Sequence, residues 1–141
     1  MPAKVCGGDP RKRRKRDMIK LLNLIIGGAV GTVARYLLGG AVYRLMGTGF
    51  PYGTLVVNVS GCFILGILAA LADKKFILGP DARVLLMIGF CGAFTTFSTL
   101  IFESDSLVRN GQAMRAFINI FASVILGFIL FRVGGLLGER I

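Results

Sequence analysis

The sequence contains no histidine, few acidic residues and no closely spaced pair of cysteines. Histidine is the usual protein metal ligand and the usual proton carrier near neutral pH, so neither role can be assigned to it here. The three cysteines, Cys6, Cys62 and Cys91, are odd in number and far apart. This spacing supports neither a zinc site nor a disulfide framework.

Charge is also scarce, because only 17% of the residues are charged, whereas 55% are hydrophobic and the mean hydropathy is +0.74. A soluble domain has about 25% charged and about 45–50% apolar residues. Most of the 20 glycines lie inside the apolar runs. Small residues suit the interfaces of membrane helices, and they would be costly in soluble ones. These features predict an integral membrane protein.

Four apolar segments, separated by short polar or turn-rich stretches, predict an all-α membrane protein with four transmembrane helices. The segments cover residues 19–46, 54–72, 82–107 and 114–137. Each is near or above the ~20 residues needed to cross a ~30 Å hydrocarbon layer. A signal peptide is the competing interpretation of the first segment, but its apolar run continues well past a signal core and no clear cleavage site follows.

The sequence predicts two regions. Residues 1–17 are expected to form a basic, disordered N-terminal extension, and residues 18–141 a four-helix transmembrane domain. The extension contains six consecutive cations, Arg11 to Arg16, in a chain of net charge +10. A basic run beside a membrane helix is typical of contact with anionic lipid headgroups. Nucleic-acid binding is the competing interpretation, and we do not expect it because no folded basic domain accompanies the run.

The distribution of cations predicts how the chain inserts. With four spans both termini share one side, which carries 13 Lys and Arg residues against three on the opposite side. Counted from Met18, a second candidate initiator, the numbers are six and three. The positive-inside rule therefore orients the full chain clearly and the shorter one only weakly.

Arg35 is a charged residue within the first apolar span, where a cation costs about 2.5–3.5 kcal/mol at the bilayer centre. One interpretation is an arginine that reaches the membrane interface. The other is a cation that concentrates anions at a pore mouth. The first, second and fourth spans contain no carboxylate to neutralise it, and this favours anions as the transported species.

Two uncharged polar groups stand out in the second and fourth spans. Asn58 offers N–H donors without carrying charge, although such an amide can also simply join two helices. Asn119 and Ser123 are four residues apart and share one helical face with Gly127. They form either a polar track or a packing seam. The spacings Gly27-x-x-x-Gly31 and Gly134-x-x-x-Gly138 are interpreted as helix packing.

The third span has the most specific pattern in the chain. Two glycines, Gly89 and Gly92, precede four hydroxyl residues within five positions: Thr95, Thr96, Ser98 and Thr99. Hydroxyl side chains bond to backbone groups and ease a local opening of a helix. Broken backbone at membrane depth is tolerated only where it is buried in protein or lines a cavity. The pattern therefore predicts a third helix that is broken in mid-membrane.

Three ordered blocks resemble the Fluc (CrcB) family of fluoride ion channels. They are residues 28–36 (GAVGTVARY), 53–61 (GTLVVNVSG) and 89–99 (GFCGAFTTFST), and Glu103 follows them. With the four-span pattern, the resemblance covers residues 18–141 in order. It implies a fluoride-specific channel that exports fluoride passively across the bacterial cytoplasmic (inner) membrane. It also implies an antiparallel, dual-topology homodimer with two pores, and no enzymatic activity.

The resemblance also implies roles for individual residues. Asn58 and Phe97 would line the fluoride pore, and Arg35 its vestibule. The remaining pore positions would be Thr96, Ser98, Thr99, Leu100 and Ser123. A structural sodium ion on the dimer axis would be held by the backbone carbonyls of Gly92 and Thr95, since oxygen ligands suit a hard cation.

The chain departs from the family at two positions: Leu100 stands where a second pore phenylalanine is usual, and Asn119 where a tyrosine is common. The main alternative function is a small four-span, dual-topology multidrug exporter. Such an exporter needs a carboxylate in its first helix, and residues 19–46 contain none.

Overall fold

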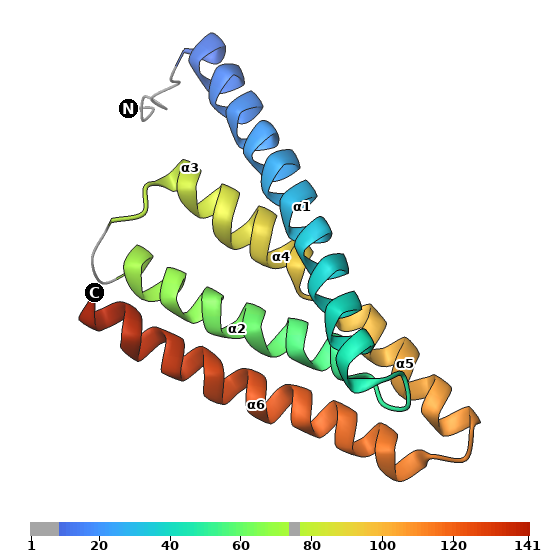
Figure 1. The fold of residues 1–141 in the computed structure, drawn as a ribbon. Coiled ribbons are helices and arrows are strands. Elements are labelled where there is room, and N and C mark those ends of the chain that lie inside the picture. Colours follow the sequence, from blue (N-terminus) through green and yellow to red (C-terminus); the bar gives the residue numbers. More distant parts are fainter. Residues whose placement is uncertain (1–8, 74–76) are drawn as a thin grey trace, which may run out of the picture.

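The computed structural model describes residues 9–73 and 77–141, and every regular element in these two stretches is helical. The elements are α1 (Pro10–Met46), α2 (Tyr52–Asp73), α3 (Pro80–Arg83), η1 (Val84–Cys91), α4 (Gly92–Phe94), α5 (Phe97–Arg109) and α6 (Ala113–Arg140) (Figure 1). Together, α3, η1, α4 and α5 make one composite third segment. Four segments are long and apolar enough to cross a membrane, which confirms the four predicted spans.

Helix α1 begins earlier than expected, at Pro10, so the basic run is helical. The side chain of Asp9 caps the helix by accepting a hydrogen bond from the N–H of Arg11 at 3.0 Å, and proline is favoured in a first turn. Lysine and arginine are good helix formers, so the apolar helix extends through them. The expectation of disorder is therefore wrong for residues 10–17. Residues 1–8, with Cys6, lie outside the described residues.

Among the described residues, the most extensive contact between helices is that of α2 with α6, which run side by side (Figure 1). A β-carbon added at Gly66 would overlap the carbonyl oxygen of Phe131, and one added at Gly134 would overlap that of Phe63. Gly138 also meets the α2 backbone closely. The packing interpretation of the Gly134–Gly138 spacing is confirmed.

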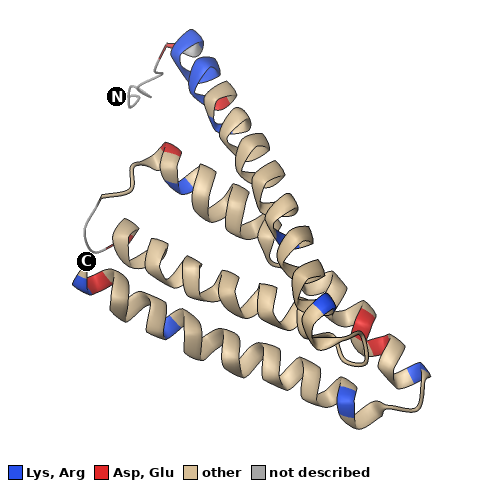
Figure 2. Cartoon of the chain, viewed as in Figure 1, with Lys and Arg blue, Asp and Glu red and all other residues tan. Residues whose placement is uncertain are grey.

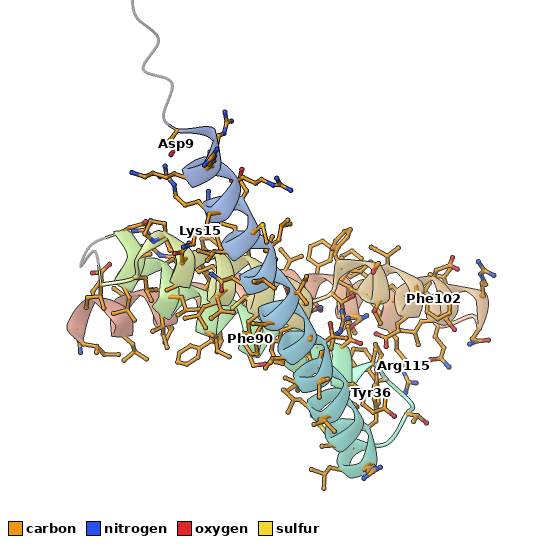
Figure 3. All side chains as sticks on the ribbon, turned by 90° about the horizontal axis from the view of Figure 1, so that it is seen from above. Asp9, Lys15, Tyr36, Phe90, Phe102 and Arg115 are labelled. Atoms are coloured by element: carbon orange, nitrogen blue, oxygen red, sulfur yellow. The ribbon has the colours of Figure 1, made fainter. Side chains whose placement is uncertain are left out.

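The second close contact is between α1 and η1, where α1 crosses the composite third segment near Phe90 (Figure 3). Here a β-carbon at Gly27 would overlap the carbonyl oxygen of Leu85, and one at Gly31 that of Phe90. The packing interpretation of this second glycine pair is confirmed as well. The π-helical turn of η1 joins α3 to α4 with helical backbone angles at both ends.

Most large apolar side chains of α1 and α6 lie on the surface; Leu37 and Phe128, for example, are 63% and 67% exposed. A soluble monomer rarely exposes such continuous apolar area. The arrangement suits a multi-pass membrane protein, in which lipid covers these faces. The start of α1 and the end of α6 lie at the same end of the bundle (Figure 1), as an even number of spans requires.

Candidate functional site

The third segment is interrupted at Thr95 and Thr96, where the hydroxyl-rich pattern predicts a break. Thr95 has φ −80° and ψ 157°, and Thr96 has φ −149° and ψ 116°, so two extended residues separate α4 from α5. The segment changes direction at this point (Figure 1). The break frees backbone groups that a continuous helix would pair.

The side chain of Asn58 on α2 forms hydrogen bonds with both the N–H and the carbonyl of Thr96. Its Oδ1 accepts the Thr96 N–H at 2.7 Å, and its Nδ2 donates to the Thr96 carbonyl at 3.0 Å. In a continuous helix the Thr96 N–H would bond to the carbonyl of Gly92, four residues earlier. Asn58 therefore holds the break open, and the Gly92 carbonyl loses its helical partner. One N–H of the Asn58 amide remains available.

The hydroxyl of Thr96 plays a similar part on the other side of the break. It caps α5 by accepting the N–H of Thr99 at 3.3 Å, and it lies 2.9 Å from the Thr99 hydroxyl. That N–H would otherwise close the helical bond to the Thr95 carbonyl. The Thr95 hydroxyl bonds back to the carbonyl of Cys91 at 3.0 Å. Two carbonyls, those of Gly92 and Thr95, are thus released from the helical ladder.

Two open grooves flank the break. The first, called here the α6-side groove, has a volume of about 240 Å³. Its lining includes Asn58, Thr95, Thr96, Phe97, Leu100 and Ser123. Leu100 is only 3% exposed, whereas the Phe97 ring is 73% exposed beside it. The groove combines an amide, hydroxyls and an aromatic ring with no carboxylate in its lining.

The second groove, called here the α1-side groove, is larger, about 460 Å³, and lies between α1, α2 and α5. Its polar lining comes from Thr32, Arg35, Tyr36, Tyr43, Thr54, Thr96, Thr99 and Glu103. Arg35 is half-buried, and its Nη1 lies 3.5 Å from the carbonyl oxygen of Thr95. A cation therefore faces one end of the break from this groove.

Glu103 is a carboxylate in the α1-side groove that the site prediction did not include. Its Oε1 accepts hydrogen bonds from the hydroxyls of Tyr43 and Thr54, each at 2.8 Å. Its Oε2 is buried and has no partner among the described residues. Thr54 lies one helical turn before Asn58, and this spacing could have indicated from the sequence that Thr54 belongs to the site. Tyr43 is 60 positions from Glu103, and no local pattern predicts that contact.

A buried polar seam joins α5 to α6. Asn119 is fully buried, its Nδ2 donates to the hydroxyl of Ser104 at 3.0 Å, and that hydroxyl donates to the carbonyl of Leu100 at 2.8 Å. Asn119 Oδ1 and the Ser123 hydroxyl are buried without a partner in the described part of the chain. Asn119 thus belongs to a packing seam, whereas Ser123 presents an unpaired hydroxyl in the α6-side groove.

The structure brings most of the predicted pore residues together, but not all of them. Asn58, Phe97, Leu100 and Ser123 share the α6-side groove, and Thr96 lines both grooves. Thr99 and Arg35 line only the α1-side groove. Ser98 is exposed and outside both linings; its hydroxyl lies 3.4 Å from that of Thr96. Gly92, one of the two predicted sodium ligands, is exposed and outside both linings too.

Comparison with known proteins gives consistent results. Residues 22–135 match the model of the family described as CrcB-like protein, Camphor Resistance (CrcB). A protein of Maridesulfovibrio salexigens named fluoride-specific ion channel FluC is 44% identical over 84% of this chain and 94% of its own length. Proteins of the same name from Rhizobium etli and Geobacter sulfurreducens are 48% and 46% identical. These two alignments cover 76% and 77% of this chain, and 86% and 88% of those proteins.

Proposed function

The chain belongs to the CrcB (FluC) family of fluoride-specific ion channels, and from this premise we propose that fluoride passes along the two grooves flanking the Thr95–Thr96 break. It is a multi-pass membrane protein and an ion channel, not an enzyme. The main observation in support of this path is the break at Thr95 and Thr96. It places an amide, several hydroxyls and a cation around exposed backbone, in segments otherwise suited to lipid.

The lining of the α6-side groove suits a small, strongly hydrated anion. Such an ion leaves water only where donors replace its hydration shell, because an unpaired charge is costly in a low dielectric. Asn58 retains one free N–H, and Ser123 has a buried hydroxyl without a partner among the described residues. The positive edge of the exposed Phe97 ring can also face an anion. These groups are uncharged, so the ion can leave as readily as it enters.

The α1-side groove supports a different task, that of collecting anions. The Arg35 guanidinium lines it and would raise the local anion concentration at the entrance of the path. Glu103 is the opposing charge, but two hydroxyl donors bind its Oε1. Hydrogen bonds to a carboxylate stabilise it in place. The vestibule role therefore depends on the Arg35 guanidinium, and Glu103 weakens the positive potential of the same groove.

We further propose that the working channel is an antiparallel homodimer. Both grooves are open at the surface of the single chain, and the Phe97 ring is 73% exposed. A second copy related by a two-fold axis would cover these openings with the same surface. Two copies of opposite orientation would then enclose two equivalent paths.

A sodium ion on that axis is part of the same proposal. The carbonyls of Gly92 and Thr95 fit a hard cation, because both are oxygen ligands that have lost their helical N–H partners. Two carbonyls from each copy would supply four oxygen ligands, and the ion would neutralise facing dipoles at the subunit contact. The Arg35 guanidinium approaches the Thr95 carbonyl at 3.5 Å, so the two cations would share this oxygen.

The test is fluoride efflux from liposomes that contain the purified protein, compared with chloride efflux. Asn58→Asp keeps the acceptor for the Thr96 N–H, but it replaces the amide donor with a negative charge. Two like charges about 4 Å apart repel each other by about 4 kcal/mol at an effective dielectric constant of about 20, so we expect fluoride efflux to fall at least about a hundredfold.

Ser60→Ala is the matched control for this substitution. Ser60 lies two residues from Asn58 and lines neither groove. Within the described part of the chain its hydroxyl bonds only to the Val57 carbonyl of its own helix. We expect the control to conduct normally. Native fluoride efflux through Asn58→Asp would remove Asn58 from the path, and vesicles that stay fluoride-tight with the native protein would overturn the assigned function.

A further inference from the structure

The helical state of the basic run gives it a shape that the sequence alone did not indicate. Six consecutive cations occupy the first turns of α1: Arg11, Lys12, Arg13, Arg14, Lys15 and Arg16. Every one of them is exposed. Successive residues in an α-helix are 100° apart, so six in a row surround the axis completely. Figure 3 shows long side chains with terminal nitrogens pointing to several sides of this end of α1, where Lys15 is labelled. We call residues 11–16 the basic ring.

The position of the basic ring along α1 is set by the apolar sequence that follows it. Helix α1 has 37 residues and is therefore about 55 Å long, whereas the hydrocarbon layer is only ~30 Å thick. Exposed apolar side chains begin at Met18 and Ile19, one residue after the ring. The ring projects beyond the rest of the bundle (Figures 1 and 2). When the apolar part of α1 is in hydrocarbon, the ring is at the depth of the lipid headgroups.

The basic ring has no carboxylate partner in the part of the chain that the structure describes. The ion pairs there join Arg83 to Asp73 and Arg109 to Asp105. Asp9 and Asp17 flank the ring in sequence. Asp9 accepts the backbone N–H of Arg11, and neither carboxylate forms an ion pair with a ring residue in the described part of the chain. Six exposed cations at one level of a membrane-entering helix therefore need counterions from outside the described chain.

We propose that the basic ring binds the headgroups of anionic phospholipids and ties this end of α1 to one leaflet. Lipid phosphates surround a membrane-entering helix on all sides, and a ring that faces every direction matches this distribution. A nucleic acid would contact one side only, and the basic ring itself contains no aromatic side chain on which bases could stack. The proposal goes beyond the fluoride path, since the basic ring lines neither groove.

The experiment measures which lipids the full chain retains. Purified protein in detergent is equilibrated with equal amounts of phosphatidylglycerol and phosphatidylcholine of identical acyl chains, separated from free lipid, and its bound lipid is quantified by mass spectrometry. We expect phosphatidylglycerol to exceed phosphatidylcholine by on the order of tenfold, because each cation near a surface attracts anionic lipid. Changing all six ring residues to Gln should bring the ratio close to one.

Two controls separate the basic ring from general charge. Replacing its four arginines by lysine keeps the charge and should keep the preference. Arg44, Arg109 and Arg115 lie on the side of the membrane opposite to the ring, and neutralising them should leave most of the phosphatidylglycerol preference. For the native chain, 1 M salt should abolish the phosphatidylglycerol preference, because salt screens the attraction between charges. This measurement does not depend on whether any variant folds.

The proposal is overturned if the six-Gln protein retains the full preference, or if the native preference survives 1 M salt. It is also overturned if a short duplex oligonucleotide displaces the phosphatidylglycerol, because the ring would then be a general polyanion site. The same preparations are also reconstituted into liposomes for fluoride efflux. Because the basic ring lines neither groove, we expect the six-Gln variant to conduct fluoride at the native rate per folded channel. A failure of the lipid proposal is therefore distinguishable from a failure of the fluoride path.

Discussion

Two serines near the break illustrate how partners decide the role of a single residue. The Ser123 hydroxyl is buried without a partner in the described chain and lines the α6-side groove. The Ser104 hydroxyl is buried as well, but it bonds to Asn119 and to the Leu100 carbonyl. The first is free to meet an ion, and the second holds two helices together.

Ser123→Ala should therefore reduce fluoride efflux without lowering stability. A hydrogen bond to a charged group is worth about 1.5–3 kcal/mol net, which corresponds to a roughly ten- to hundredfold slower efflux. No hydrogen bond within the described chain is lost, so the thermal unfolding midpoint should not fall. Both quantities can be measured on one preparation, by efflux from liposomes and by unfolding in detergent.

Ser104→Ala is the matched control, and it should show the reverse pattern. It leaves the Nδ2 of fully buried Asn119 unpaired, which costs about 1–3 kcal/mol of stability. Efflux by the protein that remains folded should change little. If Ser123→Ala destabilises the protein as much as Ser104→Ala does, Ser123 is a packing residue and not part of the path.

The pairing of α2 with α6 depends on close backbone approach at the scale of whole helices. Membrane helices lack a hydrophobic drive to associate, so their contact depends on packing density. Gly134 touches the α2 backbone, whereas its neighbour Gly135 has only an ordinary contact, 3.8 Å from an added β-carbon to the Gly66 carbonyl. Two adjacent glycines on α6 therefore have different functions.

Gly134→Ala should separate α2 from α6, because the added methyl group would overlap the Phe63 carbonyl. Overpacking of this kind costs about 1–3 kcal/mol of stability. Gly135→Ala is the control and should leave the unfolding midpoint close to native. Equal unfolding midpoints for the two variants would contradict the assigned seam.

At the scale of the whole molecule, charge is distributed unevenly between the two ends. The sequence predicts 13 cations on the side of the two termini, and the basic ring supplies six of them. In Figure 2 the cations of the ring lie together at the start of α1. An antiparallel dimer needs copies in both orientations. The ring opposes this, because positive charge favours one orientation on insertion.

We expect the full chain to insert mainly with its termini in the cytoplasm, and a chain beginning at Met18 to insert in both directions. The cation counts behind this expectation are 13 against three and six against three. Labelling of Ile141→Cys by a membrane-impermeant thiol reagent in intact cells measures the outcome. Equal labelling of the two chains would show that the basic run does not control orientation.

The proposed sodium ion gives a second prediction for the assembled channel. Replacing sodium on both sides of the membrane with a large organic cation should slow fluoride efflux at least about tenfold, because the released carbonyls of Gly92 and Thr95 would repel one another across the axis. Restoring sodium should restore the efflux. Efflux that is indifferent to sodium would argue against a structural ion at these carbonyls.

Local chemistry in the sequence was sufficient to predict the four spans, the glycine packing and the place of the break. Hydropathy over about 20 residues depends only on neighbours in the chain, and so does the tendency of four hydroxyls to open a helix near Thr95. The same local rules misplaced the start of α1. By these rules the helix was expected to begin only after the basic run, whereas the capped helix α1 already includes that run.

The partners of the polar groups were decided only by the tertiary structure. Asn58 meets Thr96 from 38 positions away, Glu103 meets Tyr43 from 60, and Asn119 meets Ser104 across two helices. These contacts depend on how closely helices pack and on which faces they turn to one another. The sequence by itself therefore determined which polar groups enter the membrane, whereas helix packing determined which of them are paired and which remain free for an ion.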